Sequence, residues 1–216
     1  MPAGSAYSAT NLAAGITPTV SPAANASFPA ANLTDGRQAK VSKMGSASTT
    51  WTLKVDLASA KTTNCVALLN HDFTATATVE IQKSSTGAFT GEQVVVVAAT
   101  TMRQESAAIT FTATSERYWR AIVTDASGTY QVGELLVANL TVFTRNFLWG
   151  YPQTYAVVTQ NVATISGAQW QYRLGNRKRV YNLEWSDITD AQRNELITMI
   201  DAAFGKLFLF VLLALQ

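Results

Sequence analysis

The sequence predicts a mainly β protein, in which a β-sandwich is followed by a small α+β segment. Two observations carry this prediction. From Trp51 to Val137 the apolar residues alternate or form short runs, which gives about seven or eight short strands with no helical pattern between them. After residue 145 the pattern changes to a β-hairpin, one helix and a C-terminal strand. We therefore expect an extended N-terminal arm at 1–27, the sandwich at 28–145 and the α+β segment at 146–216.

The composition supports a folded chain with an unusually uncharged surface. Of the 216 residues, 48% are hydrophobic and 14% are charged, and the net charge is +2. The hydrophobic fraction excludes a disordered chain, while the charged fraction lies well below the roughly 25% that is usual for soluble domains. Such a surface fits either a subunit that packs in an assembly or a secreted β module. The weak charge does not favour nucleic acid as a partner.

The predicted sandwich strands follow from alternation. Trp51, Leu53, Val55 and Leu57 share one face of a strand, which is typical of a half-buried sheet. A turn is expected at Asp125-Ala126-Ser127-Gly128. Further strands are expected around the following residues and runs: Val79 and Ile81, Ile109 and Phe111, Cys65 to Leu69, Val94 to Val97, Tyr118 to Thr124, and Val132 to Val137.

The expected arm, residues 1–27, contains Pro2, Pro18 and Pro22, no charge and no periodicity. This composition favours an extended segment that is either disordered or laid along a neighbouring chain. The chain also has no N-terminal apolar stretch of the kind that forms a secretory signal, so we expect synthesis in a cytoplasm. The longest apolar run, from Leu207 to Leu215, has nine residues, whereas a membrane helix needs about twenty. We expect no membrane insertion.

The hairpin of the α+β segment has two possible registers. A two-residue loop at Gly175-Asn176 would place Arg173 opposite Lys178, which is a pair of like charges. A four-residue loop from Gly175 to Lys178 avoids that pair and collects the apolar residues on one face, so we choose it. Its expected cross-strand pairs are Leu174 with Arg179, Tyr172 with Tyr181, Trp170 with Leu183, and Ala168 with Trp185.

A helix is expected from about 189 to 204. Thr189 and Gln192 have the spacing of a capping box, in which each side chain accepts a hydrogen bond from a free backbone amide of the first turn. The apolar stripe Leu196, Met199, Ile200 and Ala203 is expected to cover the apolar face of the hairpin, and Gly205 is expected to end the helix.

The last strand is apolar on both faces, so each face needs cover. At about 1.5–3 kcal/mol for each large apolar side chain, leaving one face in water would cost several kcal/mol. A contact with another subunit would supply the cover, and the alternative is a central strand buried within the monomer. The candidate interface residues are Leu207, Phe208, Leu209, Phe210, Val211, Leu212 and Leu213.

The residues that usually carry chemistry do not form a pattern. His71 is the only histidine, and its neighbour Asp72 would point in a different direction. Cys65 lies in an apolar run and is expected to be a buried structural residue. We therefore predict no catalytic site, no cofactor and no enzyme activity. The basic cluster Arg173, Arg177, Lys178 and Arg179 favours a solvated turn or an acidic neighbouring subunit over nucleic acid, and Arg177 and Lys178 join the candidate interface residues.

Several short motifs occur in a fixed order, namely Phe28 to Gly36, Trp51 to Leu57, Asn70-His71-Asp72, Val79 to Gln82, Arg117 to Ile122, and Val132-Gly133-Glu134-Leu135. Their order resembles the discoidin, or coagulation factor 5/8 type C, family of galactose-binding-like jelly rolls. The resemblance covers roughly residues 28–142 and implies a jelly-roll β-sandwich. In that family the Asp-Gly turn lies near a loop that often holds calcium, which makes Asp35 the one candidate metal ligand. Family sugar or lipid sites lie on loops at one end of the sandwich, but no matching set of aromatic and Arg or His residues stands out in this sequence.

The second half contains a basic strand from Arg177 to Trp185, then the helix, and then a closing strand of the form G-x-x-F-x-F from Gly205 to Phe210. This order is similar to that of tail proteins of tailed bacteriophages. The resemblance implies a structural component of a phage tail, in the tail-tip or baseplate region of the virion, made in the bacterial host cytoplasm. Its partners would be other tail proteins and copies of itself. The alternative is a carbohydrate-binding adhesion module, for which the partner is a host-surface glycan.

Overall fold

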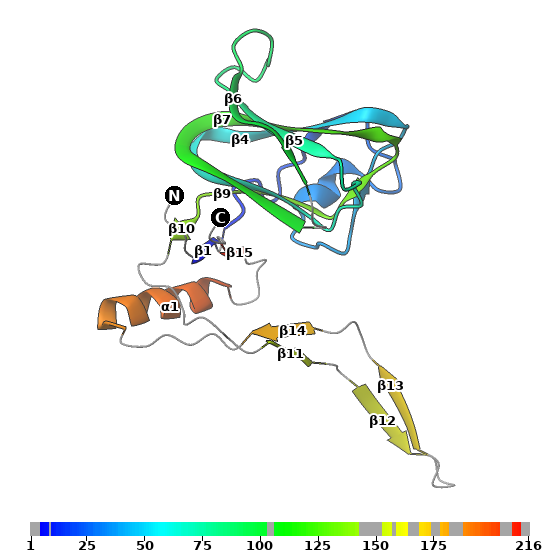
Figure 1. The fold of residues 1–216 in the computed structure, drawn as a ribbon, viewed down its shortest axis with the longest axis vertical. Coiled ribbons are helices and arrows are strands. Elements are labelled where there is room, and N and C mark those ends of the chain that lie inside the picture. Colours follow the sequence, from blue (N-terminus) through cyan, green and yellow to red (C-terminus); the bar gives the residue numbers. More distant parts are fainter. Residues whose placement is uncertain are drawn as a thin grey trace.

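The computed structural model describes residues 5–8, 10–102, 106–142, 153–156, 159–163, 169–173, 178–181, 188–203 and 209–212. These residues form a mainly β protein with one α-helix, as the sequence predicts (Figure 1). The elements of the sandwich are β2 (Thr19–Ser21), a 3-10 helix (Ala30–Thr34), β3 (Ser42–Lys43), β4 (Ser48–Leu69), β5 (Thr78–Ser84), β6 (Val94–Thr101), β7 (Ser106–Gly128), β8 (Gln131–Val132) and β9 (Glu134–Ala138).

Two long strands, β4 and β7, build both layers of the sandwich. They pair with each other along almost their whole length, and the strand order of their sheet is β2-β4-β7-β5-β6. The C-terminal end of β4 also pairs with β9. The pairing is irregular between Asp56 and Lys61, where Ala58 has a φ of 64° and its amide donates to Asp56. Both strands bend there, so one pair of strands continues from one layer into the other (Figure 1).

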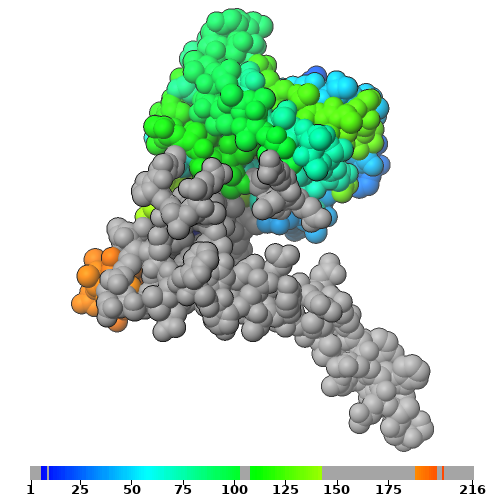
Figure 2. All heavy atoms as spheres, viewed as in Figure 1, coloured from blue at the N-terminus to red at the C-terminus, as the bar shows by residue number. Residues whose placement is uncertain are grey.

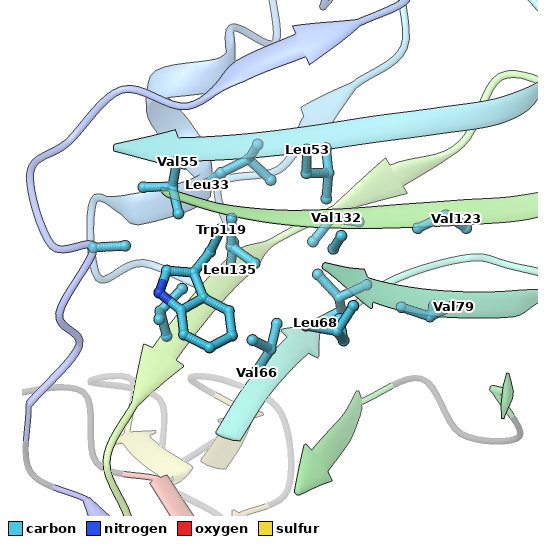
Figure 3. Close-up of a cluster of buried hydrophobic side chains, with 14 of the residues drawn as sticks. Leu33, Leu53, Val55, Val66, Leu68, Val79, Trp119, Val123, Val132 and Leu135 are labelled. Atoms are coloured by element: carbon cyan, nitrogen blue, oxygen red, sulfur yellow. The ribbon is translucent and has the colours of Figure 1, made fainter. Parts of the chain in front are cut away.

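The core lies between these layers and confirms the predicted alternation. Trp51, Leu53 and Val55 point inward from β4, and Trp119 stacks on Phe111 with ring centroids 5.5 Å apart. Figure 3 shows how Val66, Leu68 and Leu135 of the second layer meet Leu53, Val79 and Val123 of the first. These side chains are almost fully removed from water, which is the main source of stability in a sandwich of this kind. In the space-filling view the sandwich forms one closely packed body (Figure 2).

A second buried cluster lies on the other face of the β4–β9 layer. It contains Ala6, Cys65, Ala67, Leu69 and Leu136, with Ala138 and Leu140 beside them. Ala6 belongs to β1 (Ser5–Ser8), which lies between β10 (Thr141–Val142) and β15 (Leu209–Leu212) in a three-stranded sheet. This small sheet lies below the sandwich in Figure 1 and joins the first described strand to the last. The run Cys65 to Leu69 is therefore buried on both faces, as its continuous apolar sequence predicts.

The described residues of the expected N-terminal arm, 5–8 and 10–27, pack on their own chain, which corrects the expectation that the arm is either disordered or laid along a neighbouring chain. Ala13 is fully buried in the main core, and β2 pairs with β4. The Asn11 side chain accepts hydrogen bonds from the amides of Ala13 and Val137 and donates to Leu135. The arm has no long apolar period because two short strands, β1 and β2, and the hydrogen bonds of Asn11 hold it in place.

Three details of the sandwich differ from the sequence prediction. The turn expected at 125–128 is the end of β7, which runs to Gly128 before a connection at 129–130. The apolar run Val94 to Val97 does form a strand, but β6 is an edge strand and Val94 and Val95 are about half exposed. Gly133 interrupts the run Val132 to Val137 and separates β8 from β9.

The predicted hairpin register is wrong. β13 (Gln169–Arg173) pairs with β12 (Thr159–Ala163), and β14 (Lys178–Tyr181) pairs with β11 (Gln153–Ala156). We call these four strands the ribbon. Arg173 lies opposite Thr159, Lys178 opposite Ala156 and Arg179 opposite Tyr155, so every cation faces an uncharged residue. The described strands thereby avoid like-charge pairs with partners other than those that the predicted hairpin gives them.

The helix prediction is confirmed. α1 spans Asp190–Ala203, and the Gln192 amide donates to Thr189 Oγ1 while the Thr189 amide donates to Gln192 Oε1, at 3.3 and 2.9 Å. These two bonds are the predicted capping box. The expected contact between the apolar stripe and the hairpin lies outside the side chains that the structure describes, as does the helix stop at Gly205.

Candidate functional site

Three connections meet at one end of the sandwich, and two backbone features hold them there. β4 ends at Leu69, and the next residue, Asn70, has a φ of 53° in the left-handed region that asparagine tolerates. Between β8 and β9, the Gly133 amide donates to the Leu69 carbonyl at 2.9 Å. A Cβ on Gly133 would lie 2.1 Å from the Gln38 carbonyl oxygen, so this close approach requires glycine. The connections 35–41, 70–77 and 129–130 are thereby fixed side by side.

Three aromatic side chains from these connections form a cluster, which we call the aromatic end cluster: His71, Phe73 and Tyr130. The rings of His71 and Phe73 are stacked with centroids 4.5 Å apart, and Tyr130 meets Phe73 edge to face at 5.7 Å. His71 is buried, whereas Phe73 and Tyr130 are half-buried and present part of their rings to solvent. The Tyr130 hydroxyl donates to the Ala126 carbonyl, which fixes the ring.

Two carboxylates flank Tyr130. Asp125 accepts hydrogen bonds from the amides of Thr74 and Ala126, at 2.8 and 2.7 Å, and from the Thr74 hydroxyl. Partial burial of Asp125 acts to raise its pKa, but these hydrogen bonds outweigh it and lower the pKa. Asp72 is exposed and accepts the Gln131 amide at 2.8 Å. Burial, together with the charges of Asp125 and Asp72, raises the pKa of Tyr130, so both carboxylates act on its hydroxyl.

Phe28 adds an exposed ring near this end. Its carbonyl accepts the Lys43 amide at 3.1 Å, and Lys43 pairs with Gln131, the residue that follows Tyr130. The Phe28 side chain is 41% exposed. The end surface thus combines aromatic faces with hydrogen-bonding carboxylates, a combination that binds the apolar and hydroxyl groups of a polar ring compound.

Asp35, the candidate metal ligand, lies beside the fully buried Glu134. Both oxygens of each carboxylate already have protein donors: Asp35 meets the Arg37 amide and the Lys40 ammonium, and Glu134 meets the Asn11 amide group and the Gly36 amide. Each carboxylate oxygen has two lone pairs, so one donor for each oxygen does not test the calcium site, which stays a prediction from the resemblance. In the described residues no three His, Cys, Asp or Glu side chains form a group that could hold a metal ion.

The remaining candidates from the sequence lie elsewhere. Burial raises the pKa of the Cys65 thiol to about 12, which makes it inert as a nucleophile. Leu209, Phe210, Val211 and Leu212 form β15, which pairs with β1, and within the described strands β15 is at the edge of its sheet. Lys178 begins β14. Leu207, Phe208, Leu213 and Arg177 lie outside the described residues. The part of the chain that the structure describes contains no helix with the length and hydropathy needed to cross a bilayer.

No protein-family model matches this sequence, and no curated protein matches it either. Solved structures do. Chitosan-binding module 1 from a chitosanase/glucanase of Paenibacillus sp. IK-5 is 27% identical and superposes with a TM-score of 0.53, covering 60% of this chain and 99% of that one. Module 2 of the same enzyme, in complex with chitotriose, is 24% identical with a TM-score of 0.52 and covers 60% and 100%. A Ruminococcus gnavus fucosidase in complex with fucose is 15% identical with a TM-score of 0.51 and covers 61% and 27%.

The sandwich has the galactose-binding-like fold of carbohydrate-binding modules. This confirms the fold class that the motif order implies. None of the three solved structures described above is a phage tail protein. They support the predicted fold of the sandwich, but they do not support the phage origin that the second half of the sequence suggests.

Sequence reasoning missed the aromatic end cluster. Phe73 and Tyr130 are 57 residues apart in the chain, and each occurs in a polar connection with no pattern of its own. The contact of Gly133 with Leu69 and the hydrogen bond from the Gln131 amide to Asp72 bring the two connections together. The one available signal was His71-Asp72-Phe73, an aromatic pair directly after a buried strand.

Proposed function

We propose that this protein binds carbohydrate at the end of the sandwich that carries the aromatic end cluster. The observation that supports the proposal best is the series of ring contacts from His71 through Phe73 to Tyr130, flanked by Asp72 and Asp125. Aromatic faces pack against the C–H surface of a sugar ring, and carboxylates accept hydrogen bonds from its hydroxyl groups. The likeness to a chitosan-binding module supports the same conclusion.

The charge around Tyr130 favours sugars that carry amino groups. Asp72 and Asp125 both add negative charge at the Tyr130 hydroxyl. An ammonium group on the ligand would gain from this charge, whereas the carboxylate of a uronic acid would be repelled. We therefore propose that glucosamine-type oligosaccharides bind more tightly than N-acetylated or acidic ones.

The test is titration of the full chain with chitosan oligosaccharides, their N-acetylated forms and oligogalacturonate, followed by calorimetry or NMR shifts. Tyr130→Ala should weaken binding at least about tenfold, which corresponds to the loss of one aromatic contact of about 1.5 kcal/mol. Asp72→Asn keeps an oxygen for the Gln131 amide but removes the charge, so it should reduce the preference for the amino sugar. Tyr118→Ala and Asp201→Asn are the matched controls.

Two outcomes would contradict the proposal. If no oligosaccharide binds, or if Tyr130→Ala binds as the unchanged chain does, the aromatic end cluster is not a sugar site. If binding persists but Asp72→Asn leaves the preference for amino sugars unchanged, only the amino-sugar part of the proposal is wrong.

The two similar chitosan-binding modules are binding modules of a larger enzyme. This agrees with the expectation that the present chain itself is not an enzyme.

A second candidate is the role of a structural subunit in the tail tip or baseplate of a bacteriophage virion. It is supported by the similarity of residues 177–210 to phage tail proteins and by the position of β15, an apolar strand at the edge of its described sheet. On this hypothesis the partners are other tail proteins and copies of the chain, and a sugar-binding sandwich would face the host surface. Antibody labelling of purified phage particles, seen by electron microscopy, tests the hypothesis; particles without label would contradict it.

A further inference from the structure

Phe73 of the aromatic end cluster is tied to the rest of the cluster through both of its neighbours in the sequence. The residue before it is Asp72, whose carboxylate accepts the Gln131 amide at 2.8 Å. The residue after it is Thr74, whose amide donates to Asp125 Oδ2 at 2.8 Å and whose hydroxyl donates to Asp125 Oδ1. Phe73 is therefore held at two points, one on each side of it in the chain.

A series of hydrogen bonds continues from Asp125 to the ring of Tyr130. Asp125 Oδ1 also accepts the Ala126 amide at 2.7 Å, and the Ala126 carbonyl accepts the Tyr130 hydroxyl. The ring fixed in this way meets Phe73 edge to face, with centroids 5.7 Å apart. The contacts of Thr74 and Asp125 therefore join the backbone that carries one ring to the hydroxyl group of the other.

The two carboxylates beside Tyr130 differ in how much of their hydrogen-bonding capacity the protein uses. A carboxylate has about four acceptor positions. Protein donors occupy three of those of Asp125, which is half-buried. Asp72 is exposed, and among the described residues only the Gln131 amide donates to it. Asp72 thus has acceptor positions left for the hydroxyl or ammonium groups of a ligand, whereas Asp125 has almost none.

We propose that Asp125 and Thr74 are positioning residues of the sugar site and that Asp72 is the carboxylate that contacts the ligand. This inference rests on the proposed function and assigns its parts to different residues. A site whose binding geometry is populated only in part loses affinity in the same proportion. Loss of the contact between Asp125 and Thr74 therefore lowers the affinity for charged and uncharged sugars alike. Loss of the charge of Asp72 instead changes the preference between them.

The test is titration of the full chain with chitosan oligosaccharides and with their fully N-acetylated forms, which carry no ammonium group. Thr74→Val removes the hydroxyl that donates to Asp125 and leaves every charge in place. It should weaken the binding of both ligands by a similar factor of about three to ten, so that the ratio of the two affinities stays constant. Thr74→Ser keeps the hydroxyl and should restore the affinity. Thr112→Val, at an exposed threonine of β7, is the matched control.

Two further measurements separate positioning from a general loss of structure. Asp125→Asn replaces one acceptor oxygen by an amide group, so it breaks the same contact as Thr74→Val. The effects of these two changes on the N-acetylated ligand should therefore not add in the double variant. In the unliganded protein, nuclear Overhauser effects between the Phe73 and Tyr130 rings should weaken in both single variants and persist in Thr74→Ser. Circular dichroism confirms that each variant is folded.

The outcomes distinguish this inference from the proposed function. If the unchanged chain binds sugar and Thr74→Val binds both ligands equally well, or if Thr74→Ser fails to restore the affinity, the positioning role is wrong. It is also wrong if Thr74→Val weakens only the charged ligand. If Asp72→Asn leaves the ratio of the two affinities unchanged, Asp72 is not the contacting carboxylate. If the unchanged chain binds no oligosaccharide, the proposed function itself is wrong, and the division of roles falls with it.

Discussion

Glu134 is fully buried at the end of the sandwich, next to the charge of Asp35. Burial raises its pKa from 4.5 to about 7, and Asp35 adds to the rise, while the hydrogen bonds from Asn11 and Gly36 lower it. A carboxyl group whose pKa is raised by folding binds its proton more tightly in the folded state. Its contribution to stability is therefore complete below pH 4.5 and is lost as the pH rises through about 7.

Glu134→Gln should remove this dependence. As the pH falls from about 7 to 4.5, the free energy of unfolding of the original chain should rise by up to about 3 kcal/mol relative to that of the variant. Urea denaturation of both proteins at several pH values measures the difference, in which the titration of all other groups cancels. A constant difference would mean that Glu134 has an ordinary pKa in the folded protein.

At the scale of the element, α1 depends on its first turn. Thr189→Ala removes the hydroxyl that accepts the Gln192 amide, and loss of such a cap costs about 1 kcal/mol. We expect faster amide hydrogen exchange in the first turns of α1 and no change in the sandwich strands. Thr189→Ser keeps the hydroxyl and is the control. Equal exchange in Thr189→Ala and the original chain would show that tertiary contacts, and not the cap, hold the start of the helix.

How well the sequence predicts each element depends on how local its cause is. The α1 capping box needs residues three apart, and Trp51, Leu53 and Val55 face inward through alternation alone, so both were predictable. The ribbon was not, because its register depends on which earlier strand is available to pair. Thr159 and Tyr155 supply uncharged partners for Arg173 and Arg179, and the hairpin prediction never considered them. The contact of Phe73 with Tyr130 was not predictable for the same reason, because the two residues are far apart in the sequence.

At the scale of the whole molecule, β6 is the last strand at one edge of the main sheet, and no other described strand pairs with its outer side. It contains no charged residue and no proline, and Val94 and Val95 are 52% and 50% exposed. Charged residues are the usual protection of such edges against pairing with other chains. Val95→Lys should therefore reduce aggregation during refolding while leaving the melting temperature nearly unchanged, since the side chain is half in water already. Light scattering during refolding measures this, and unchanged scattering would show that the β6 edge is not where the chains aggregate.

The small sheet under the sandwich has a consequence for synthesis. β1 pairs on one side with β10 and on the other with β15, whose residues come last among those described. About 200 residues separate β1 from β15, so at about 5–20 residues per second a ribosome needs roughly 10–40 s to deliver the second partner. The sandwich strands emerge earlier and can close around their core during that time. β15 can pair with β1 only after that time, so the small sheet is completed later than the sandwich above it.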